Sequence, residues 1–118
     1  MIEMTVAKEP FRFLGEDYQR YYEYYIMLEN DRVQGVLHFE VFPTRIDTVL
    51  TRKAKDDFFH KDALFRGALN HMAIKGITHC KLEGEVLEFF ETHYRQKKVL
   101  KDHVVDIPAF FAEGCGGH

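Results

Sequence analysis

The chain has 118 residues, of which 46% are hydrophobic and 14% aromatic, which is enough to form one domain with a buried core over residues 1–118. Its 16 Lys and Arg against 19 Asp and Glu give a net charge of −3, which argues against a dedicated nucleic-acid binder because such proteins gain affinity by neutralising phosphates. Two cysteines are too few for a disulfide scaffold, and no basic leader or long apolar run indicates export or membrane insertion, so we expect a cytoplasmic protein.

The first part of the chain predicts an edge strand and a hairpin. Residues 5–13 are expected to form the edge strand, because Pro10 within them is tolerated best at an edge. A turn is expected at residues 15–17. Residues 21–29 are rich in Tyr, Ile and Met and predict a strand, and a turn at Asn30 and Asp31 leads into its hairpin partner.

That partner, residues 33–42, alternates between apolar and polar side chains, as a half-buried strand should. Pro43 ends it, and residues 46–51 are expected to form a third strand in which Ile46, Thr48 and Leu50 share one face. The three strands together predict an antiparallel meander.

The second half of the chain predicts helix, strand, helix and a closing strand pair. Residues 60–75 place their apolar side chains at helical spacing, and Gly76 suits the left-handed residue that ends a helix. Residues 77–83 predict a short strand, and residues 85–94 a second helix with acidic residues in its first turn. Residues 99–100 and 104–107 predict a final strand pair, after which residues 109–112 are expected to dock the tail onto the sheet.

This order of elements resembles the GNAT acyltransferase superfamily over roughly residues 21–107. The most specific stretches are Lys75-Gly-Ile-Thr, at the end of the long helix, and Leu87-Glu-Phe-Phe-Glu-Thr-His-Tyr in the second helix. The resemblance implies an α+β fold with a mixed sheet, acetyl-CoA as cofactor, and an amine as acyl acceptor. The first strand and the two helices that usually open that fold are abbreviated or missing.

In the superfamily, a loop with the pattern Q/R-x-x-G-x-G/A holds the pyrophosphate of the cofactor at a helix N-terminus, where backbone N–H groups and the helix dipole favour an anion. The matching residues 52–61 contain no glycine, and bulky side chains stand at the two usual glycine positions, near Phe59 and Lys61. Asp56 and Asp57 are expected to cap the helix. The resemblance implies these candidate cofactor contacts: Leu50, Arg52, Lys53, Lys55, His60 and Lys61.

Two residues are candidates for proton transfer. The tyrosine with which members of the superfamily often protonate the leaving thiolate is matched here by Phe90, so Tyr94, one turn further on, is the candidate acid. Glu40 is the candidate base, and His38 lies on the same strand face. The alternative is that Glu40 and His38 are ordinary residues of a solvent-facing sheet surface.

Other patterns leave alternatives open. The five tyrosines between residues 18 and 25 suit either a plain sheet or an interface, and an aromatic-rich edge would favour a homodimer. Cys115 and His118 are two potential metal ligands, but the sequence offers no pattern for the rest of a site, so we expect no metal. The sequence leaves three functions open: an N-acetyltransferase, a GNAT-like binding or assembly module that has lost the cofactor, and a small metal-binding protein that uses Cys115 and His118.

Overall fold

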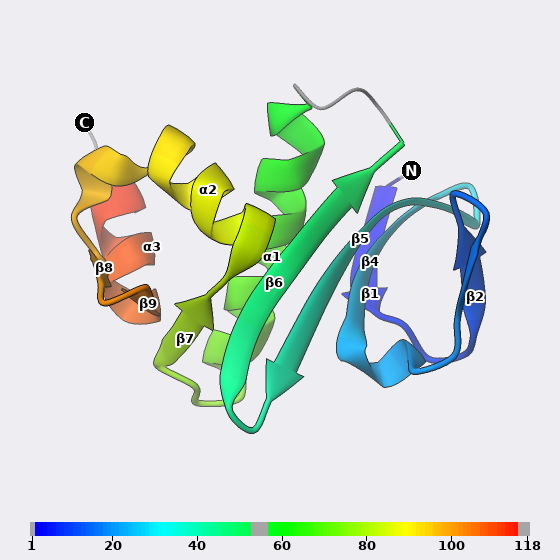
Figure 1. The fold of residues 1–118 in the computed structure, drawn as a ribbon, viewed down its shortest axis with the longest axis horizontal. Coiled ribbons are helices and arrows are strands. Elements are labelled where there is room, and N and C mark those ends of the chain that lie inside the picture. The colour runs from blue at the N-terminus through cyan, green and yellow to red at the C-terminus, as the bar shows by residue number, and fades with distance from the viewer. Residues whose placement is uncertain (1, 53–56, 116–118) are drawn as a thin grey trace.

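The structure, a computed structural model, describes residues 2–52 and 57–115. Figure 1 shows the chain running from an N-terminal sheet region to a C-terminal group of helices. The strands are β1 (Ile2–Val6), β2 (Phe11–Phe13), β3 (Glu16–Tyr18), β4 (Tyr24–Glu29), β5 (Arg32–Val41), β6 (Thr44–Thr51), β7 (His79–Leu82), β8 (Leu100–Lys101) and β9 (Val104–Asp106). The helices are α1 (Phe58–Ile74), α2 (Gly84–His93) and α3 (Ile107–Cys115), with short 3₁₀ turns at Tyr21–Glu23 and Arg95–Lys97.

Seven strands form one sheet in the order β1-β4-β5-β6-β7-β9-β8, and β2 and β3 form a separate hairpin. Neighbouring strands of the sheet are antiparallel except β6 and β7, which are parallel and are connected through α1. The predicted meander is confirmed as β4, β5 and β6, and the α+β class and the helix–strand–helix order that follows are confirmed as well.

Helix α1 forms and ends as its sequence predicts. Its buried residues recur at helical spacing and face the sheet: Leu64, Phe65, Ala68, Leu69 and Met72. At its C-terminus Gly76 adopts a φ of +83°, and the N–H groups of Gly76 and Ile77 donate to the carbonyls of Ala73 and Met72. This pairing satisfies the last carbonyls of the helix in the manner of a Schellman motif.

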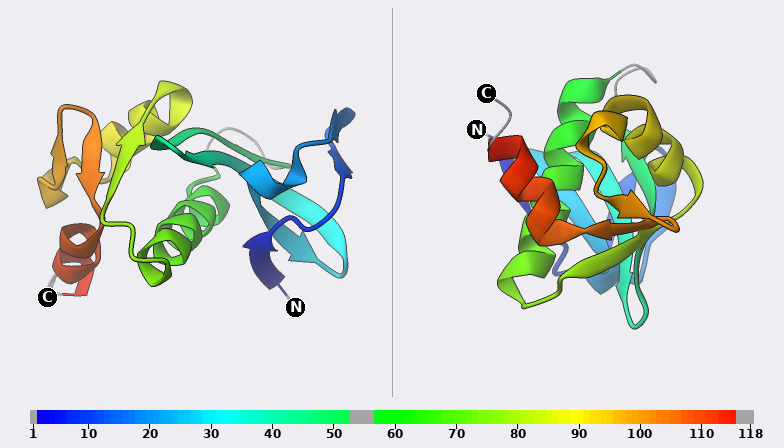
Figure 2. Two further views of the ribbon diagram at one scale, coloured as in Figure 1. Left: turned by 90° about the horizontal axis from the view of Figure 1, so that it is seen from below. Right: turned by 90° about the vertical axis from the view of Figure 1, so that its left-hand side faces the viewer.

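The two faces of the sheet are covered differently. Helices α1 and α3 lie on one face (Figure 2), and the side chains of Met27, Leu37 and Val49 point into that core. The β2–β3 hairpin contributes Phe13 to a second, smaller core with Ile26 and Val36 on the other face of the same strands. No helix in the described ranges is long and apolar enough to cross a membrane.

The tyrosine-rich strand β4 lies inside the sheet. Strand β4 pairs with β1 on one side and β5 on the other, so β1 is the edge. Tyr24 packs with Tyr18 at 4.8 Å between ring centroids, and Tyr25 is 8% exposed on the opposite face. Most of this aromatic surface therefore serves the two cores.

Three further predictions differ from the structure. Residues 5–13 do not form one strand, because β1 ends at Val6 and the chain then leaves the sheet to form the β2–β3 hairpin. The turn of that hairpin is shorter than the expected residues 15–17, since Glu16 and Asp17 belong to β3. The even alternation expected over residues 46–51 is interrupted by a bulge described below. The tail after Pro108 is a helix, which proline permits because its first turn needs no backbone N–H donor.

Phe110 should be essential to stability, because α3 is a structural layer and the Phe110 side chain is 0% exposed between Phe65 and Phe90. We expect Phe110→Ala to lower the free energy of unfolding by about 3–5 kcal/mol. The matched control is Phe59→Ala, since Phe59 is 71% exposed and its loss should cost less than about 0.5 kcal/mol. Urea denaturation measures both, and equal losses would show that α3 does not pack as described.

Candidate functional site

A bulge on β6 ends the parallel pairing with β7. On its β7 side, β6 forms only two residue pairs, Arg45 with Lys81 and Ile46 with Leu82. On its β5 side, Ile46 is opposite Phe39 and Thr48 is opposite His38. Asp47 lies between these two pairs as an extra residue without a partner on β5. The N–H of Glu83 still donates to the carbonyl of Ile46, and then α2 begins. From Asp47 onward, β6 has no strand partner on its β7 side within the described part of the chain.

Gly84 permits this close departure of α2 from β6. Its φ is +54°, and an added Cβ would lie 3.2 Å from the carbonyl oxygen of Asp47. A larger residue would therefore meet both an unfavourable backbone conformation and a tight contact with β6. The helix thus starts directly against the bulge.

Polar side chains gather beside the bulge, on the sheet face opposite α1. His38 Nδ1 lies 2.8 Å from Asp47 Oδ1, and His38 Nε2 lies 3.3 Å from Glu23 Oε2. An imidazolium would donate to both carboxylates, whereas a neutral ring donates to one of them. His38 is therefore held by one carboxylate at each of its two ring nitrogens.

Arg45 holds the candidate base Glu40. The guanidinium lies 2.7 Å from Glu40 Oε1 and 3.1 Å from Glu83 Oε1, and so connects β5, β6 and the start of α2. The hydrogen bond from Arg45 lowers the pKa of Glu40. Glu40 is on the same face as His38, as the alternation of β5 predicts, but a carboxylate with a lowered pKa and a fixed cation partner is the weaker proton acceptor of the two.

The candidate acid Tyr94 lies elsewhere, in the core between the helices. It is 3% exposed, its ring stacks on Phe65 at 5.7 Å, and its hydroxyl donates to Asp62 on α1. Burial raises the pKa of Tyr94 far above its ordinary value, and the bond to Asp62 adds to that. No hydrogen bond or ion pair links Tyr94 to Glu40 among the described residues, so the structure does not bring the two together.

The N-terminus of α1 is capped by the chain's own carboxylate. Asp57 Oδ1 accepts from the His60 N–H at 3.3 Å and lies 2.8 Å from His60 Nδ1, and the Asp57 side chain is 5% exposed. Capping by Asp57 is as predicted, while Asp56 lies outside the described residues. An incoming phosphate would meet a negative charge at the place where the helix dipole favours an anion.

The candidate cofactor contacts divide into three groups. Arg52 and His60 are brought together, because both line a cavity of about 150 Å³ beside Asp57. Leu50 packs instead against the second core, and Lys61 is half-buried in the first turn of α1. Lys53 and Lys55 lie outside the described residues, as does His118. The described residues contain no cluster of three or more potential metal ligands.

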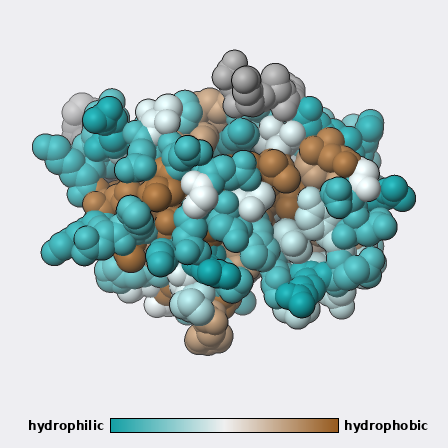
Figure 3. Space-filling view, viewed as in Figure 1, coloured by the Kyte–Doolittle hydropathy of each residue, from teal (hydrophilic) through white to brown (hydrophobic). Residues whose placement is uncertain are grey.

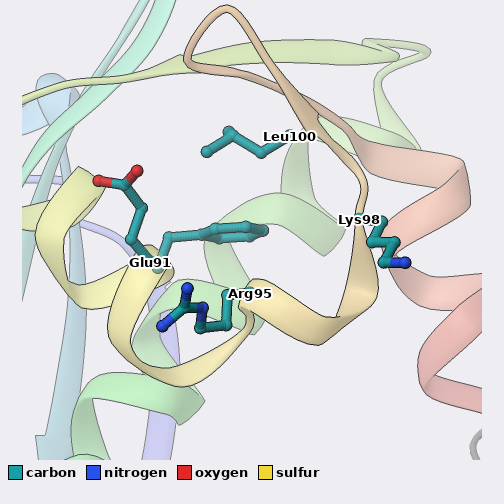
Figure 4. A pocket seen from close by; sticks show the side chains of 5 residues that line it. Glu91, Arg95, Lys98 and Leu100 are labelled. Carbon is teal, nitrogen blue, oxygen red and sulfur yellow. The ribbon is translucent and has the colours of Figure 1, made fainter.

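A second hollow separates α2 from β8. It has a volume of about 480 Å³ and is lined by the hydrophobic residues Phe90 and Leu100. Charged side chains line it as well: Glu91, Arg95 and Lys98 (Figure 4). Hydrophobic residues gather there within a hydrophilic rim (Figure 3). Phe90, which matches the tyrosine expected from the resemblance, therefore has neither a proton to give nor a position beside the bulge.

Four members of the polar group were not predicted: Glu23, Arg45, Asp47 and Glu83. One signal was available for Asp47. Ile46 and Val49, both buried, are three residues apart and not two or four, which indicates an extra residue in the strand. The other three depend on contacts between distant segments, such as that of Arg45 with Glu83.

The carboxylate of Asp57 should make stability depend on acid. Burial raises its pKa, but hydrogen bonds from His60 outweigh that effect and the net pKa lies below the ordinary value. A lowered pKa in the folded state gives stability that is complete above about pH 5 and is lost as the pH falls below about 4. We expect Asp57→Asn to keep the cap and flatten this acid dependence, and Asp57→Ala also to lose about 1–2 kcal/mol at pH 7.

Thermal unfolding between pH 3 and pH 7 tests this expectation, with Glu91→Gln as the control for removing an exposed carboxylate. If Asp57→Asn unfolds with the same pH dependence as the original chain, Asp57 is not the buried ionised cap described here.

Comparison with known proteins assigns no family to this chain. No protein-family model matches the sequence, and no curated protein or solved structure matches it. Functional inference therefore depends on the sequence and on the geometry given above.

Proposed function

We propose that this chain is a divergent GNAT-like protein that transfers an acyl group from acyl-CoA to an amine. The observation that carries the proposal is the parallel pair β6–β7, joined through α1 and limited to two residue pairs by the bulge at Asp47. Besides the loop at the helix N-terminus, the resemblance to the GNAT superfamily implies that acyl-CoA binds at a splayed strand pair, and β6–β7 is a pair of that kind.

The unpaired side of β6 suits an extended amide-containing ligand. Backbone groups beyond Ile46 are without a strand partner toward β7, so the two amides of a pantetheine arm can pair with them as an added strand would. The thioester would then lie near the bulge. Bulges often occur beside active sites because they re-aim the strand.

The polar group beside the bulge supplies the proton acceptor. In the proposed reaction, the amine nitrogen attacks the thioester carbonyl, the carbon–sulfur bond breaks, and the amine loses a proton. His38 is the residue we assign to take that proton, because Asp47 and Glu23 flank its two ring nitrogens and stabilise the imidazolium. Glu40 is already paired with Arg45.

One observation favours a second candidate, a GNAT-like binding module that does not use CoA. Asp57 occupies the anion-favouring end of α1, and residues 52–61 contain no glycine through which backbone N–H groups could approach a diphosphate. In this candidate the sheet and its polar group bind a partner without chemistry.

Binding of acetyl-CoA separates the two candidates. The acyltransferase predicts stabilisation of the folded chain, by about 1.4 kcal/mol at a free concentration tenfold above the dissociation constant. Arg52→Gln should weaken this effect, because Arg52 lies beside the N-terminus of α1. The control Arg12→Gln removes the same charge from a side chain that is 71% exposed on the β2–β3 hairpin. Thermal shift measures each variant against its own unliganded form, and no shift at millimolar acetyl-CoA would leave only the binding module.

The role of His38 makes a kinetic prediction. Removal of a general base usually lowers the rate by about 10²–10⁴-fold, so His38→Gln should reduce release of free thiol from acetyl-CoA in the presence of an amine by at least about 100-fold. The control is His79→Gln, since His79 is exposed on β7. Equal rates in the two variants would remove His38 from the reaction while leaving cofactor binding untouched.

A further inference from the structure

A groove opens between the 3₁₀ turn Tyr21–Glu23 and the β5–β6 hairpin, next to the polar group at the bulge. Its volume is about 390 Å³, which is within the range of small-molecule sites. The turn and the hairpin face each other at the end of β5 (Figure 1). Aromatic rings and carboxylates line it together: Tyr22, Phe42, Glu23 and Glu40.

The two aromatic residues of the groove, Tyr22 and Phe42, are exposed and do not pack in either core. Phe42 is 94% exposed at the hairpin turn and Tyr22 is 64% exposed, and neither belongs to the two cores. Two large exposed rings that line one groove offer π-faces to a ligand, and a cation over such a face is attracted by the ring quadrupole.

The carboxylates have acceptor capacity left over. Glu23 uses Oε2 toward His38, and Glu40 uses Oε1 toward Arg45. Within the described ranges, the second oxygen of each, Glu23 Oε1 and Glu40 Oε2, has no hydrogen-bond partner. An ammonium group supplies the donors that these oxygens lack. Arg20 also lines the groove and disfavours a second positive charge on the same ligand.

We infer that this groove binds an alkyl monoamine, with the ammonium at Glu23 and Glu40 and the alkyl stem against Tyr22 and Phe42. The inference deepens the proposed function, on which it rests for its biological meaning, by naming the class of acyl acceptor. Glu23 contacts both the groove and His38, and His38 contacts Asp47 at the bulge. An amine seated here is therefore adjacent to the residue assigned to accept its proton.

Direct binding to the whole chain, without CoA, tests the inference. Titration with n-pentylamine followed by backbone amide NMR should move resonances of the 3₁₀ turn and the β5–β6 hairpin, while 1-pentanol and hexanoate should bind more weakly. Phe42→Leu keeps an apolar side chain but removes the π-face, and should weaken amine binding about two- to fivefold. Glu23→Gln should weaken it about fivefold.

Matched controls are Phe59→Leu and Glu91→Gln, which make the same changes at exposed positions on α1 and α2. The inference is overturned if pentanol binds as tightly as pentylamine, if the controls weaken binding as much as the groove variants, or if spermidine binds more tightly than pentylamine. Failure of acetyl-CoA to bind would sink the proposed reaction and leave this amine site standing. If acetyl-CoA binds but pentylamine does not, the amine site is wrong and the proposed reaction is not affected.

Discussion

The extra residue at Asp47 is the constraint on which the arrangement of this molecule depends. Before it, β6 and β7 are paired in parallel; after it, β6 twists away with β5, and β7 turns directly into α2. Because a bulge leaves one residue without an opposite partner and increases local twist, a single insertion can separate two strands that began as neighbours. It also turns the carboxylate of Asp47 toward His38 on the outer face. Asp47 thus both interrupts the strand pairing and supplies a carboxylate to the polar group.

The two ends of α1 show how differently local and distant forces specify a helix. Its C-terminus is determined locally, by Gly76 and the hydrogen bonds of the turn. At its N-terminus, Asp57 supplies the acceptor that the first N–H groups need, and in doing so occupies the position that favours an anion. A chain that gains stability from its own carboxylate there gives up part of its attraction for a phosphate. Stability and diphosphate affinity compete for the same few N–H donors.

Sequence reasoning recovered what short-range periodicity encodes. The meander, α1, β7, α2 and the last strand pair follow from apolar spacing and from turn residues such as Gly76. The β2–β3 hairpin could not be predicted in this way, because it depends on the packing of Phe11 and Phe13 against Ile26 and Val36 of distant strands. Helix α3 was not predicted, because a short apolar run is compatible with a helix and equally with an irregular tail docked on the sheet. At the site, His38 and Glu40 could be placed on one face, but their relative strength as bases depends on Arg45.

The proposed acyl transfer depends less on a proton donor than on a proton acceptor. Phe90 cannot donate a proton, and Tyr94 is held by Asp62 in the core, so neither residue can supply a proton at the bulge. A thiol has a pKa near 8.5, so a thiolate leaves at neutral pH without a general acid. An alkylammonium has a pKa near that of lysine, about 10.4, and cannot attack until it loses a proton. Selection for acyl transfer would therefore retain the acceptor for that proton longer than the donor. The pattern found here, with His38 held by two carboxylates and the tyrosine position filled by phenylalanine, is the one that this asymmetry favours.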